Sequence, residues 1–257
     1  IPEQKKIASI LTSVDEVIEK TQSQIEKLQD LKKGMVNELL TKGIGHTEFK
    51  DSELGRIPKS WEVALLSDHA SRVLGKNDIG NTNVLTASAI DGLINQKKYF
   101  NKSVSSSDIS HYTLLRRGDF AYNKSYSNGY PVGVVRQLEK YDLGVLSPLY
   151  ICFSITSNEC DKTYLSYYFN SYIFERELNL VVQEGARAHG LLNIPVNDFF
   201  DRKLLIPNLP EQKIIVSILN SIDNQIDQKK QKLNKKQSLK KSLMQCLLTG
   251  KVRVKVN

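Results

Sequence analysis

The sequence has few of the features that mark secreted, membrane-spanning or metal-binding proteins. Its 257 residues include three cysteines, Cys152, Cys160 and Cys246, which are too few and too irregularly spaced for a disulfide framework or a CxxC metal site. No apolar run approaches the ~18 residues of a membrane span, and no secretory signal pattern is present. These absences predict a reduced, cytoplasmic protein with no membrane partner. The chain starts at Ile1 without a Met, which is compatible with a longer parent protein.

Catalytic signatures are also missing. The sequence has no Asn-Pro-Pro-Tyr or Asp-Pro-Pro-Tyr motif, no glycine-rich S-adenosylmethionine loop, no Walker A sequence, no HExxH and no GxSxG. Its histidines lack carboxylate or cysteine partners at ligand spacing; they are His46, His69, His111 and His189. The sequence therefore predicts a protein that is not an enzyme and has no metal or cofactor of its own.

The positive charge is unevenly distributed. The formal net charge is +8, yet residues 1–43 carry seven basic and seven acidic side chains, and residues 44–208 carry eighteen of each. The excess lies in residues 209–257, with eleven basic and three acidic side chains, and a local excess of nine over four lies in 71–136. An anionic partner is therefore expected to meet the first half of the middle region and the C-terminal segment.

A repeat at an offset of 208 residues organises the chain. The segment Ile1-Pro-Glu-Gln-Lys-Lys-Ile-Ala-Ser-Ile-Leu-Thr-Ser-Val-Asp15 returns as Leu209-Pro-Glu-Gln-Lys-Ile-Ile-Val-Ser-Ile-Leu-Asn-Ser-Ile-Asp223, and 19 of 41 aligned positions are identical. Two unrelated helices rich in Lys and Gln would not keep Pro-Glu-Gln, both Asp residues and a later Leu-Leu-Thr in one register. The repeat is a duplication.

Both copies are predicted to be long helices. Apolar residues recur at heptad spacing in each, a Pro suits the first turn, and Gly43 and Gly250 suit C-terminal caps. A helix of ~40 residues is ~60 Å long at 1.5 Å per residue, too long for a compact domain. We expect the two helices to form an antiparallel coiled coil. The alternative for such apolar stripes is an ordinary helix-bundle core.

The segment between the helices changes character and predicts a separate domain. Short β-type runs bounded by turn residues replace the helical periodicity, and 164–179 is predicted to be one amphipathic helix. We expect an α+β protein made of a spacer helix at 1–43, a mixed α/β domain with a curved sheet at 44–208, and a second spacer helix at 209–257.

Three segments of this domain resemble the specificity subunits of type I restriction-modification systems. Leu54-Gly-Arg-Ile-Pro-Lys-Ser-Trp-Glu-Val63 resembles the start of their target recognition domain. Leu115-Arg-Arg-Gly-Asp-Phe-Ala-Tyr-Asn123 resembles the central strand, and Leu204-Leu-Ile-Pro-Asn-Leu-Pro-Glu-Gln212 resembles the exit into the spacer helix. The order of segments and both helices agree with the family. A full member usually has two recognition domains, so the chain resembles a C-terminal half or a natural half-subunit.

The resemblance implies a protein that reads double-stranded DNA for other subunits. The recognition domain would read one half of a bipartite target, while the helices act as a ruler and as a dock for the methyltransferase subunit. That subunit would methylate adenine N6 with S-adenosylmethionine, and a restriction subunit would add ATP-driven cleavage. A homodimer of half-subunits is also expected, because a bipartite reader needs two recognition domains.

Several polar segments of the middle domain are candidates for DNA contact because Asn, Lys, Ser and Arg read base edges or grip phosphates. The preferred segment is the loop 123–130, followed by 185–190, 76–77 and 97–98. The candidate residues are Asn123, Lys124, Ser125, Tyr126, Ser127, Asn128, Tyr130, Arg187, His189, Lys76, Asn77, Lys97 and Lys98.

Each candidate also has a plain structural interpretation. The loop 123–130 could be a hairpin whose Asn128-Gly129 makes a tight turn, and the other segments could be solvated surface. For the whole chain, the rival hypothesis is a coiled-coil interaction scaffold whose middle domain binds protein rather than DNA. The neutral charge of 44–208 favours that rival. An enzyme with an unrecognised site is a third, weaker hypothesis.

Overall fold

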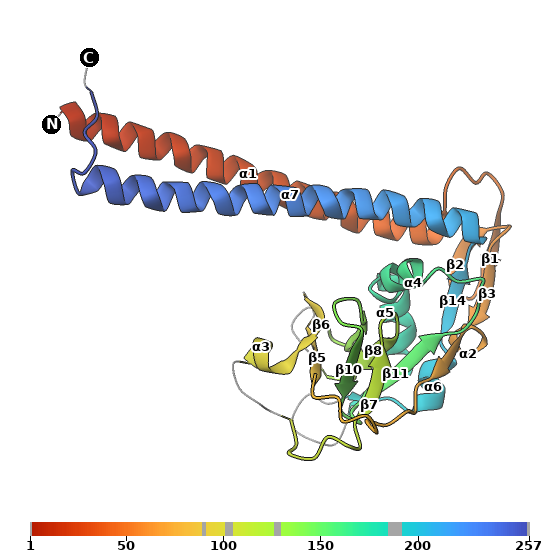
Figure 1. Ribbon diagram of the computed structural model, residues 1–257. Coiled ribbons are helices and arrows are strands. Elements are labelled where there is room, and N and C mark those ends of the chain that lie inside the picture. Colours follow the sequence, from red (N-terminus) through yellow and green to blue (C-terminus); the bar gives the residue numbers. More distant parts are fainter. Residues whose placement is uncertain (1, 89–90, 101–104, 126–129, 185–191, 256–257) are drawn as a thin grey trace. The chain divides into compact units, whose positions relative to one another are not determined.

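The computed structural model describes residues 2–88, 91–100, 105–125, 130–184 and 192–255. The chain divides into two compact units, one made of Ile1–Val36 with Ser217–Asn257 and the other of Asn37–Val216 (Figure 1). The boundaries between the units fall inside the two long helices rather than at their ends. The last turns of the first helix and the first turns of the second therefore belong to the middle unit. Among the described residues, no helix combines the length and apolar character needed to cross a bilayer.

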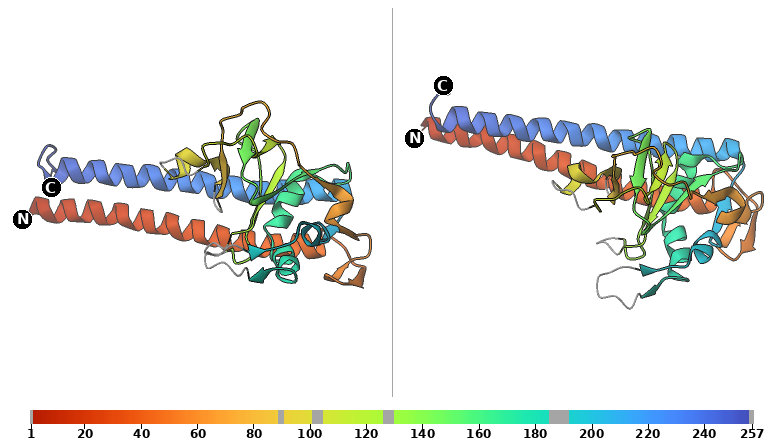
Figure 2. Two further views of the ribbon diagram at one scale, coloured as in Figure 1. Left: turned by 90° about the horizontal axis from the view of Figure 1, so that it is seen from below. Right: turned by 60° about the horizontal axis from the view of Figure 1, so that its bottom comes forward.

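The first unit is a pair of long antiparallel helices, taken from α1 (Pro2–Lys42) and α7 (Leu209–Leu248). The helices lie side by side in all three ribbon views (Figures 1 and 2). Their shared core is made of Ile25, Ile222, Ile226 and Leu233, each less than 10% exposed. Ile18, Leu28 and Met35 pack against this core. Supercoiling of the pair into a coiled coil stays a prediction.

Ion pairs between the helices follow the duplication. Lys32 Nζ lies 2.6 Å from Asp223 Oδ1, and Lys240 pairs with Asp15. Asp223 is the repeat equivalent of Asp15, and Lys240 is the equivalent of Lys32, so the two pairs are the same contact made twice. Two related helices packed antiparallel bring equivalent residues together in this reciprocal way. Both copies of the repeat therefore carry the residues that favour this register of the helix pair.

The second unit holds the strands and short helices. Its strands are β1 (Phe49–Ser52), β2 (Gly55–Pro58), β3 (Glu62–Leu65), β4 (Ala70–Arg72), β5 (Leu85–Ser88), β6 (Gly92–Asn95), β7 (Thr113–Arg116), β8 (Phe120–Asn123), β9 (Val134–Gln137), β10 (Leu143–Leu146), β11 (Tyr150–Ile155), β12 (Gln183–Glu184), β13 (Leu192–Asn193) and β14 (Lys203–Ile206). Its helices are α2 (Leu66–His69), α3 (Gln96–Phe100), α4 (Lys162–Phe169), α5 (Tyr172–Asn179) and α6 (Val196–Phe200).

The central sheet has the order β4-β11-β8-β9, with antiparallel pairing throughout. Smaller antiparallel pairs surround it: β1-β2, β3-β14, β5-β6, β7-β10 and β12-β13. The described helices and strands form the mixed α/β domain that was expected, and the curvature of the sheet stays a prediction. Because β3 pairs with β14, the strand that enters the domain lies beside the strand that leaves it.

The two faces of the central sheet bury different side chains. On one face, Phe120 and Phe153 stack at 5.4 Å between ring centroids. Aromatic side chains of α4, α5 and α6 pack around them, including Phe169 and Phe199. On the other face, small side chains such as Ala121 meet leucines from β5, β6, β7 and β10. Residues alternate between faces because successive side chains of a strand point in opposite directions.

The predicted single helix over 164–179 is wrong. The structure has two helices, α4 and α5, separated at Asn170 and Ser171. Asn170 ends α4 as its C-cap, and its side-chain amide donates to Ser166 O at 2.6 Å. Ser171 then starts α5 in extended backbone geometry. Short polar side chains such as these bond to nearby backbone and compete with helix continuation.

A buried carboxylate fixes the point where α7 begins. Glu211 Oε1 accepts a hydrogen bond from Ile44 N at 3.1 Å and lies 2.7 Å from His46 Nε2, while Oε2 accepts from the indole of Trp61 at 3.0 Å. Gly43, with φ of 64°, ends α1 beside this carboxylate, and a Cβ there would lie 2.3 Å from Glu211 Oε1. Glycine is therefore required at this helix end.

Gln212 reinforces this junction. It is fully buried, its side-chain oxygen accepts from Asp161 N at 2.7 Å, and its amide donates to the carbonyls of Glu159 and Pro207 at 2.8 Å. The repeated Pro-Glu-Gln motif thus ties the start of α7 to three separate segments of the middle unit.

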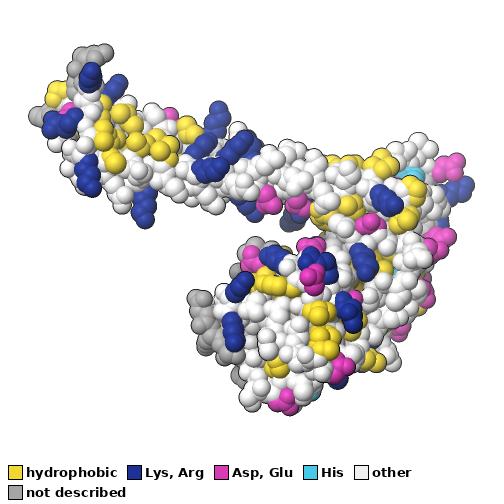
Figure 3. All heavy atoms as spheres, viewed as in Figure 1, with side chains coloured by type: hydrophobic (Ala, Val, Ile, Leu, Met, Phe, Trp, Pro, Cys, Tyr) yellow, Lys and Arg dark blue, Asp and Glu magenta, His cyan; other side chains and the backbone are white. Residues whose placement is uncertain are grey.

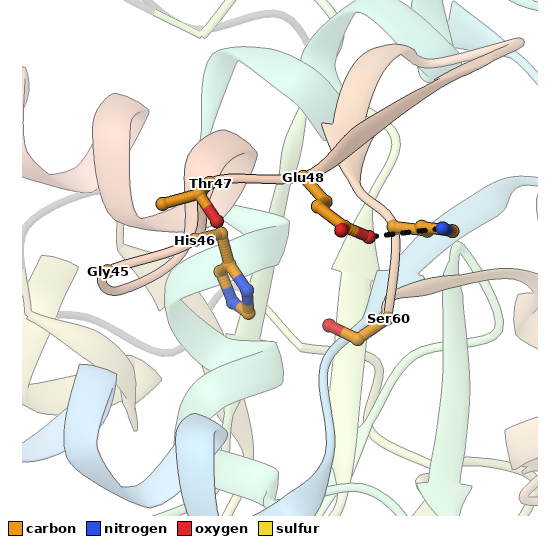
Figure 4. Close-up of a pocket in the computed structure, with 6 residues that line it drawn as sticks. Gly45, His46, Thr47, Glu48 and Ser60 are labelled. Carbon is orange, nitrogen blue, oxygen red and sulfur yellow. Dashed lines mark hydrogen bonds and ion pairs between the residues drawn. The ribbon is translucent and has the colours of Figure 1, made fainter.

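A shallow pocket of about 410 Å³ is lined by residues 45–48 with Lys59 and Ser60 (Figure 4). Glu48 and Lys59 of this lining form an ion pair at 3.0 Å.

We expect Glu211→Ala to lower the free energy of unfolding by about 3 kcal/mol, because it leaves buried donors without an acceptor. Urea denaturation followed by tryptophan fluorescence measures this directly, since Trp61 is the chain's one tryptophan. Glu3→Ala, at the equivalent position of the first copy, is the matched control and should have a much smaller effect, because its carboxylate partners are exposed. Equal destabilisation by both variants would contradict the junction's role.

Candidate nucleic-acid interface

The preferred loop begins directly after β8 in the centre of the sheet. Asn123 is the last residue of this strand, and its side-chain oxygen accepts a hydrogen bond from Ser125 N at 3.2 Å. Lys124 is half-buried; burial lowers its pKa, and the nearby positive charge of Arg72 lowers it further. Tyr126, Ser127 and Asn128 lie outside the described residues.

A backbone contact joins this loop to the base of the second candidate loop. Leu192 N donates to Lys124 O at 2.7 Å. Leu192 begins β13, which pairs with β12, and residues 185–191 connect the two strands. Arg187 and His189 belong to that connection and lie outside the described residues. The segments flanking the two preferred loops therefore meet in the fold although Lys124 and Leu192 are 68 positions apart, which no sequence pattern indicated.

Arg72 joins the candidate set from the structure. It is exposed at the end of β4 and pairs in register with Phe153 of β11. Its charge is close enough to Lys124 to lower the pKa of that lysine. The only indication of this residue in the sequence is the local basic excess in 71–136. In the central sheet Arg72 lies level with Phe153 and with Phe120, which is on β8 four residues before Lys124, and no sequence pattern indicates this strand order.

Lys76 and Asn77 follow β4 but differ in their exposure. Lys76 is exposed, and its backbone forms an isolated bridge with Thr113. Asn77 is 4% exposed, its amide nitrogen donates to Asn81 O at 2.9 Å, and its oxygen accepts from Asn81 N at 2.7 Å. The Asn77 side chain is thus used inside the loop and shapes the segment that carries Lys76.

The remaining candidates lie on or beside the β5-β6 hairpin. Lys97 and Lys98 are exposed on α3, next to the exposed rings of Tyr99 and Phe100. These two rings meet edge to face at 4.8 Å. Cationic and aromatic side chains on one short helix form a surface that suits phosphates and bases.

Tyr130 closes the preferred loop on the other side. Its ring centroid lies 5.3 Å from the guanidinium carbon of Arg136, a residue of β9. Nothing in the sequence singles out Arg136, because an arginine inside a β-type run carries no distinctive signal. In the structure, Arg136 contacts Tyr130 at the exit of the loop and also Ser88 and Asn170.

Charges of both signs are mixed over the middle unit, in keeping with its neutral balance, whereas basic side chains predominate on the helices in the same view (Figure 3). Burial raises the pKa of Cys152 to about 12 and that of Cys160 to about 11, so neither thiol is a nucleophile near neutral pH. Within the described ranges, no group of three or more metal-ligating side chains comes together. Polar and cationic groups suited to an anionic polymer are what this surface offers.

Comparison with known proteins decides among the classes that such a surface allows. No family model matches the chain. The type I restriction enzyme MjaVIII specificity subunit of Methanocaldococcus jannaschii is 34% identical over 271 residues, covering 99% of this chain and 61% of the relative. The MjaX specificity subunit of the same organism is 31% identical over 274 residues, covering 99% of this chain and 58% of the relative.

The chain is homologous to type I specificity subunits. The resemblance noted in the sequence is thereby confirmed, over essentially the whole chain. The chain spans about three fifths of the length of these curated relatives, so the activity and partners of a whole subunit are matters for proposal.

Solved structures agree on the fold of this specificity-subunit homologue. The HsdS subunit from Thermoanaerobacter tengcongensis superposes with a TM-score of 0.57 at 16% identity, over 96% of this chain and 57% of that one. The S subunit of a type I restriction-modification system from M. genitalium gives a TM-score of 0.51 at 12% identity, over 99% and 62%. At these identities the likeness shows a shared fold.

We expect thiol labelling with Ellman's reagent at pH 8 to modify Cys246 first. Cys246 is partly exposed, whereas Cys152 and Cys160 are buried and remain protonated three or more pH units below their raised pKa values. The Cys246→Ser variant should show no fast phase in the native protein and two reactive thiols in urea. Rapid modification of two or three thiols in the native protein would contradict the burial of the sheet.

Proposed function

We propose that this chain is a DNA-reading subunit that directs type I adenine-N6 methyltransferase and restriction subunits to their target. The observation that carries the proposal is the homology to specificity subunits over 99% of this chain. On this proposal the chain is not an enzyme: S-adenosylmethionine and ATP are bound by the partner subunits, and base flipping and methylation take place there.

The described surface fits one division of labour between phosphate and base contacts. Lys124 and Arg72 are two cations close enough to affect one another, an arrangement that a DNA phosphate between them would stabilise. Asn123 and Ser125 carry hydrogen-bonding groups suited to base edges at the start of the same loop. Lys76, Lys97 and Lys98 would add phosphate contacts on either side. Asn77 has a positioning role, since its side chain is buried.

The two helices are proposed to separate half-sites and to dock the methyltransferase subunit. Helices of about 40 residues correspond to ~60 Å, or roughly two turns of B-DNA. Apolar side chains outside the shared core support docking: Val17 is 46% exposed, Leu31 51% and Leu239 55%. Exposed apolar groups on a charged helix mark contact surfaces for other proteins.

A second recognition domain is proposed from differences between the two copies of the repeat. Leu40 is fully buried, whereas its equivalent Leu248 is 62% exposed. Gln212 is also fully buried, whereas its equivalent Gln4 is exposed. Residues that the duplication placed in a domain junction at one site therefore lie open at the other. A domain of the same fold, contributed by a second copy of this chain, would cover them.

Glu3 supports the same proposal. Its carboxylate accepts from Arg253 at 2.9 and 2.7 Å and from Val254 N at 3.0 Å. Val254 is the repeat equivalent of His46, which approaches Glu211 in the junction of the middle domain. Glu3 thus contacts the segment that follows α7, just as Glu211 contacts the segment that follows α1. Among the described residues, no indole is a partner of Glu3, whereas Glu211 binds the indole of Trp61.

One observation favours the rival hypothesis of a protein-binding scaffold. Residues 44–208 carry equal numbers of basic and acidic side chains, and DNA-binding surfaces are usually basic. In that case the middle domain would bind another protein and would show no salt-dependent affinity for DNA. Measurement of DNA binding separates the two hypotheses.

We expect the chain, with its methyltransferase subunit, to select one bipartite sequence from a library of random duplexes. Lys124→Ala should weaken binding to all duplexes alike and reduce the salt slope of log Kd by about 1, as the loss of one phosphate contact does. Fluorescence anisotropy over a salt series measures both. Lys59→Ala is the matched control, because the Lys59 charge is already paired with Glu48 at 3.0 Å. Failure to enrich any sequence would favour the scaffold.

For the second recognition domain, we expect light scattering of the DNA-bound complex to give two copies of this chain. Leu248→Glu should reduce this to one copy, because it places a charge in the proposed junction. Leu180→Glu is the control for an added charge: Leu180 is 70% exposed and lies outside both long helices, so it belongs neither to the proposed junction nor to the proposed docking surface. One copy in the wild-type complex, or equal effects of both variants, would contradict the proposal.

A further inference from the structure

Arg136 joins three segments of the middle unit. It lies on β9 and is partly buried. Its Nε donates to Ser88 O at 3.1 Å, and one terminal nitrogen donates to Val135 O at 2.9 Å and to the side-chain oxygen of Asn170. The same guanidinium lies over the ring of Tyr130. A single cation therefore holds the end of β5, the end of α4 and the exit of the loop 123–130.

Both ends of the loop 123–130 are held at this place. Asn123 pairs with Val134 across β8 and β9, and Gly133 allows the close approach, since a Cβ there would lie 2.1 Å from Asn123 O. Tyr130 is then fixed by its contact with Arg136. These two anchors, one on the backbone and one on a side chain, hold the described residues at which the loop begins and ends.

Arg136 also connects the loop with the hairpin that carries α3. Ser88 is the last residue of β5, and β6 leads directly into α3 with its two exposed lysines. The Ser88 hydroxyl donates a hydrogen bond to Asp91 Oδ2 at 3.1 Å, which links the end of β5 to the residue before β6. Two of the proposed DNA-contacting segments thus share one internal anchor.

The anchor requires a guanidinium. Its donors lie in one rigid plane and can satisfy carbonyl and amide oxygens in different directions while the ring of Tyr130 covers the face. An ammonium has one centre of charge on a flexible stem and cannot hold these partners in the same geometry. Burial lowers the pKa of Arg136, and its contacts with Tyr130 act in the opposite direction.

We infer that Arg136 is a positioning residue for sequence recognition, which holds Tyr130, and through β9 the strand end at Asn123, in place relative to the α3 hairpin and does not itself touch DNA. The inference rests on the proposed function and deepens it. Base readout depends on hydrogen-bond geometry, whereas the grip on phosphates tolerates small shifts. Loss of the anchor should therefore reduce discrimination between sequences more than overall affinity.

The test compares Arg136→Lys with wild type in the complex with the methyltransferase subunit. Kd is measured for the selected target, for single-base variants of it and for an unrelated duplex. We expect the Kd for the unrelated duplex to stay within about twofold, and the ratio between target and single-base variants to fall by about tenfold. Arg117→Lys is the control, because Arg117 is exposed and its guanidinium is paired with Asp142 at 2.9 Å.

A second variant guards against a simple folding defect. Tyr130→Leu keeps the hydrogen bonds of Arg136 to Ser88, Val135 and Asn170 and removes the ring and the hydroxyl of Tyr130 that contact Arg136, so it should lower discrimination in the same way without altering the melting temperature of the domain. The double variant Arg136→Lys/Tyr130→Leu should be no worse than Arg136→Lys alone, since both act through one contact. If Arg136→Lys does not fold, Tyr130→Leu decides the question alone.

Two results would overturn the inference. An equal loss of affinity for every duplex would mean that Arg136 grips phosphate directly, and unchanged discrimination in both variants would mean that it does not position the loop. A wild-type complex that shows no preference for any sequence would instead overturn the proposed function, and the inference would fall with it. The wild-type measurement thus separates the two failures.

Discussion

The carboxylate of Glu211 is the contact on which the junction between the first turn of α7 and the rest of the middle unit depends. It accepts hydrogen bonds from the chain leaving α1 and from the indole of Trp61, which directly precedes β3. Gly43 provides the space that this arrangement needs. Because β3 and β14 are paired, the entrance and exit of the domain are held together a few residues from this carboxylate. These contacts, all within the middle unit, hold together the segments at which the domain begins and ends.

The duplication explains why the helices carry the same residues in two environments. Lys32 with Asp223 and Lys240 with Asp15 are equivalent contacts, so the antiparallel pairing is favoured by both copies. Glu211 and Glu3 are equivalent as well, but one is buried with an indole and the other pairs with an exposed arginine. On the proposed function, the two equivalent ends would present two recognition domains to the two halves of a split target.

Much of the architecture could be predicted from the sequence, and the exceptions have physical causes. The helices were predictable because heptad spacing, a first-turn proline and capping glycines all agree over 40 residues. The break between α4 and α5 was missed because Asn170 and Ser171 act through local side-chain bonds that periodicity does not reveal. Strand order, which brings Arg72 towards Lys124 and Leu192 to the backbone of Lys124, depends on pairings between residues far apart in the chain.

The candidate site was likewise predictable only in part. Residue types pointed to the loop beginning at Asn123, since polar groups and a cation follow a buried strand there. The burial of Asn77 could not be inferred, because a polar residue between glycines resembles a surface loop until its amide partners are known. Arg136 was overlooked because its importance lies in the segments that it joins rather than in its own position in the sequence.

The central claim, that this chain gives a methyltransferase its sequence specificity, is tested most directly by methylome sequencing of cells that carry the chain together with its methyltransferase subunit. The account predicts a single bipartite adenine motif that is methylated only when this chain is present, and a symmetric motif if two copies work together. Methylation that is the same with and without the chain, while the two proteins bind one another, would contradict it.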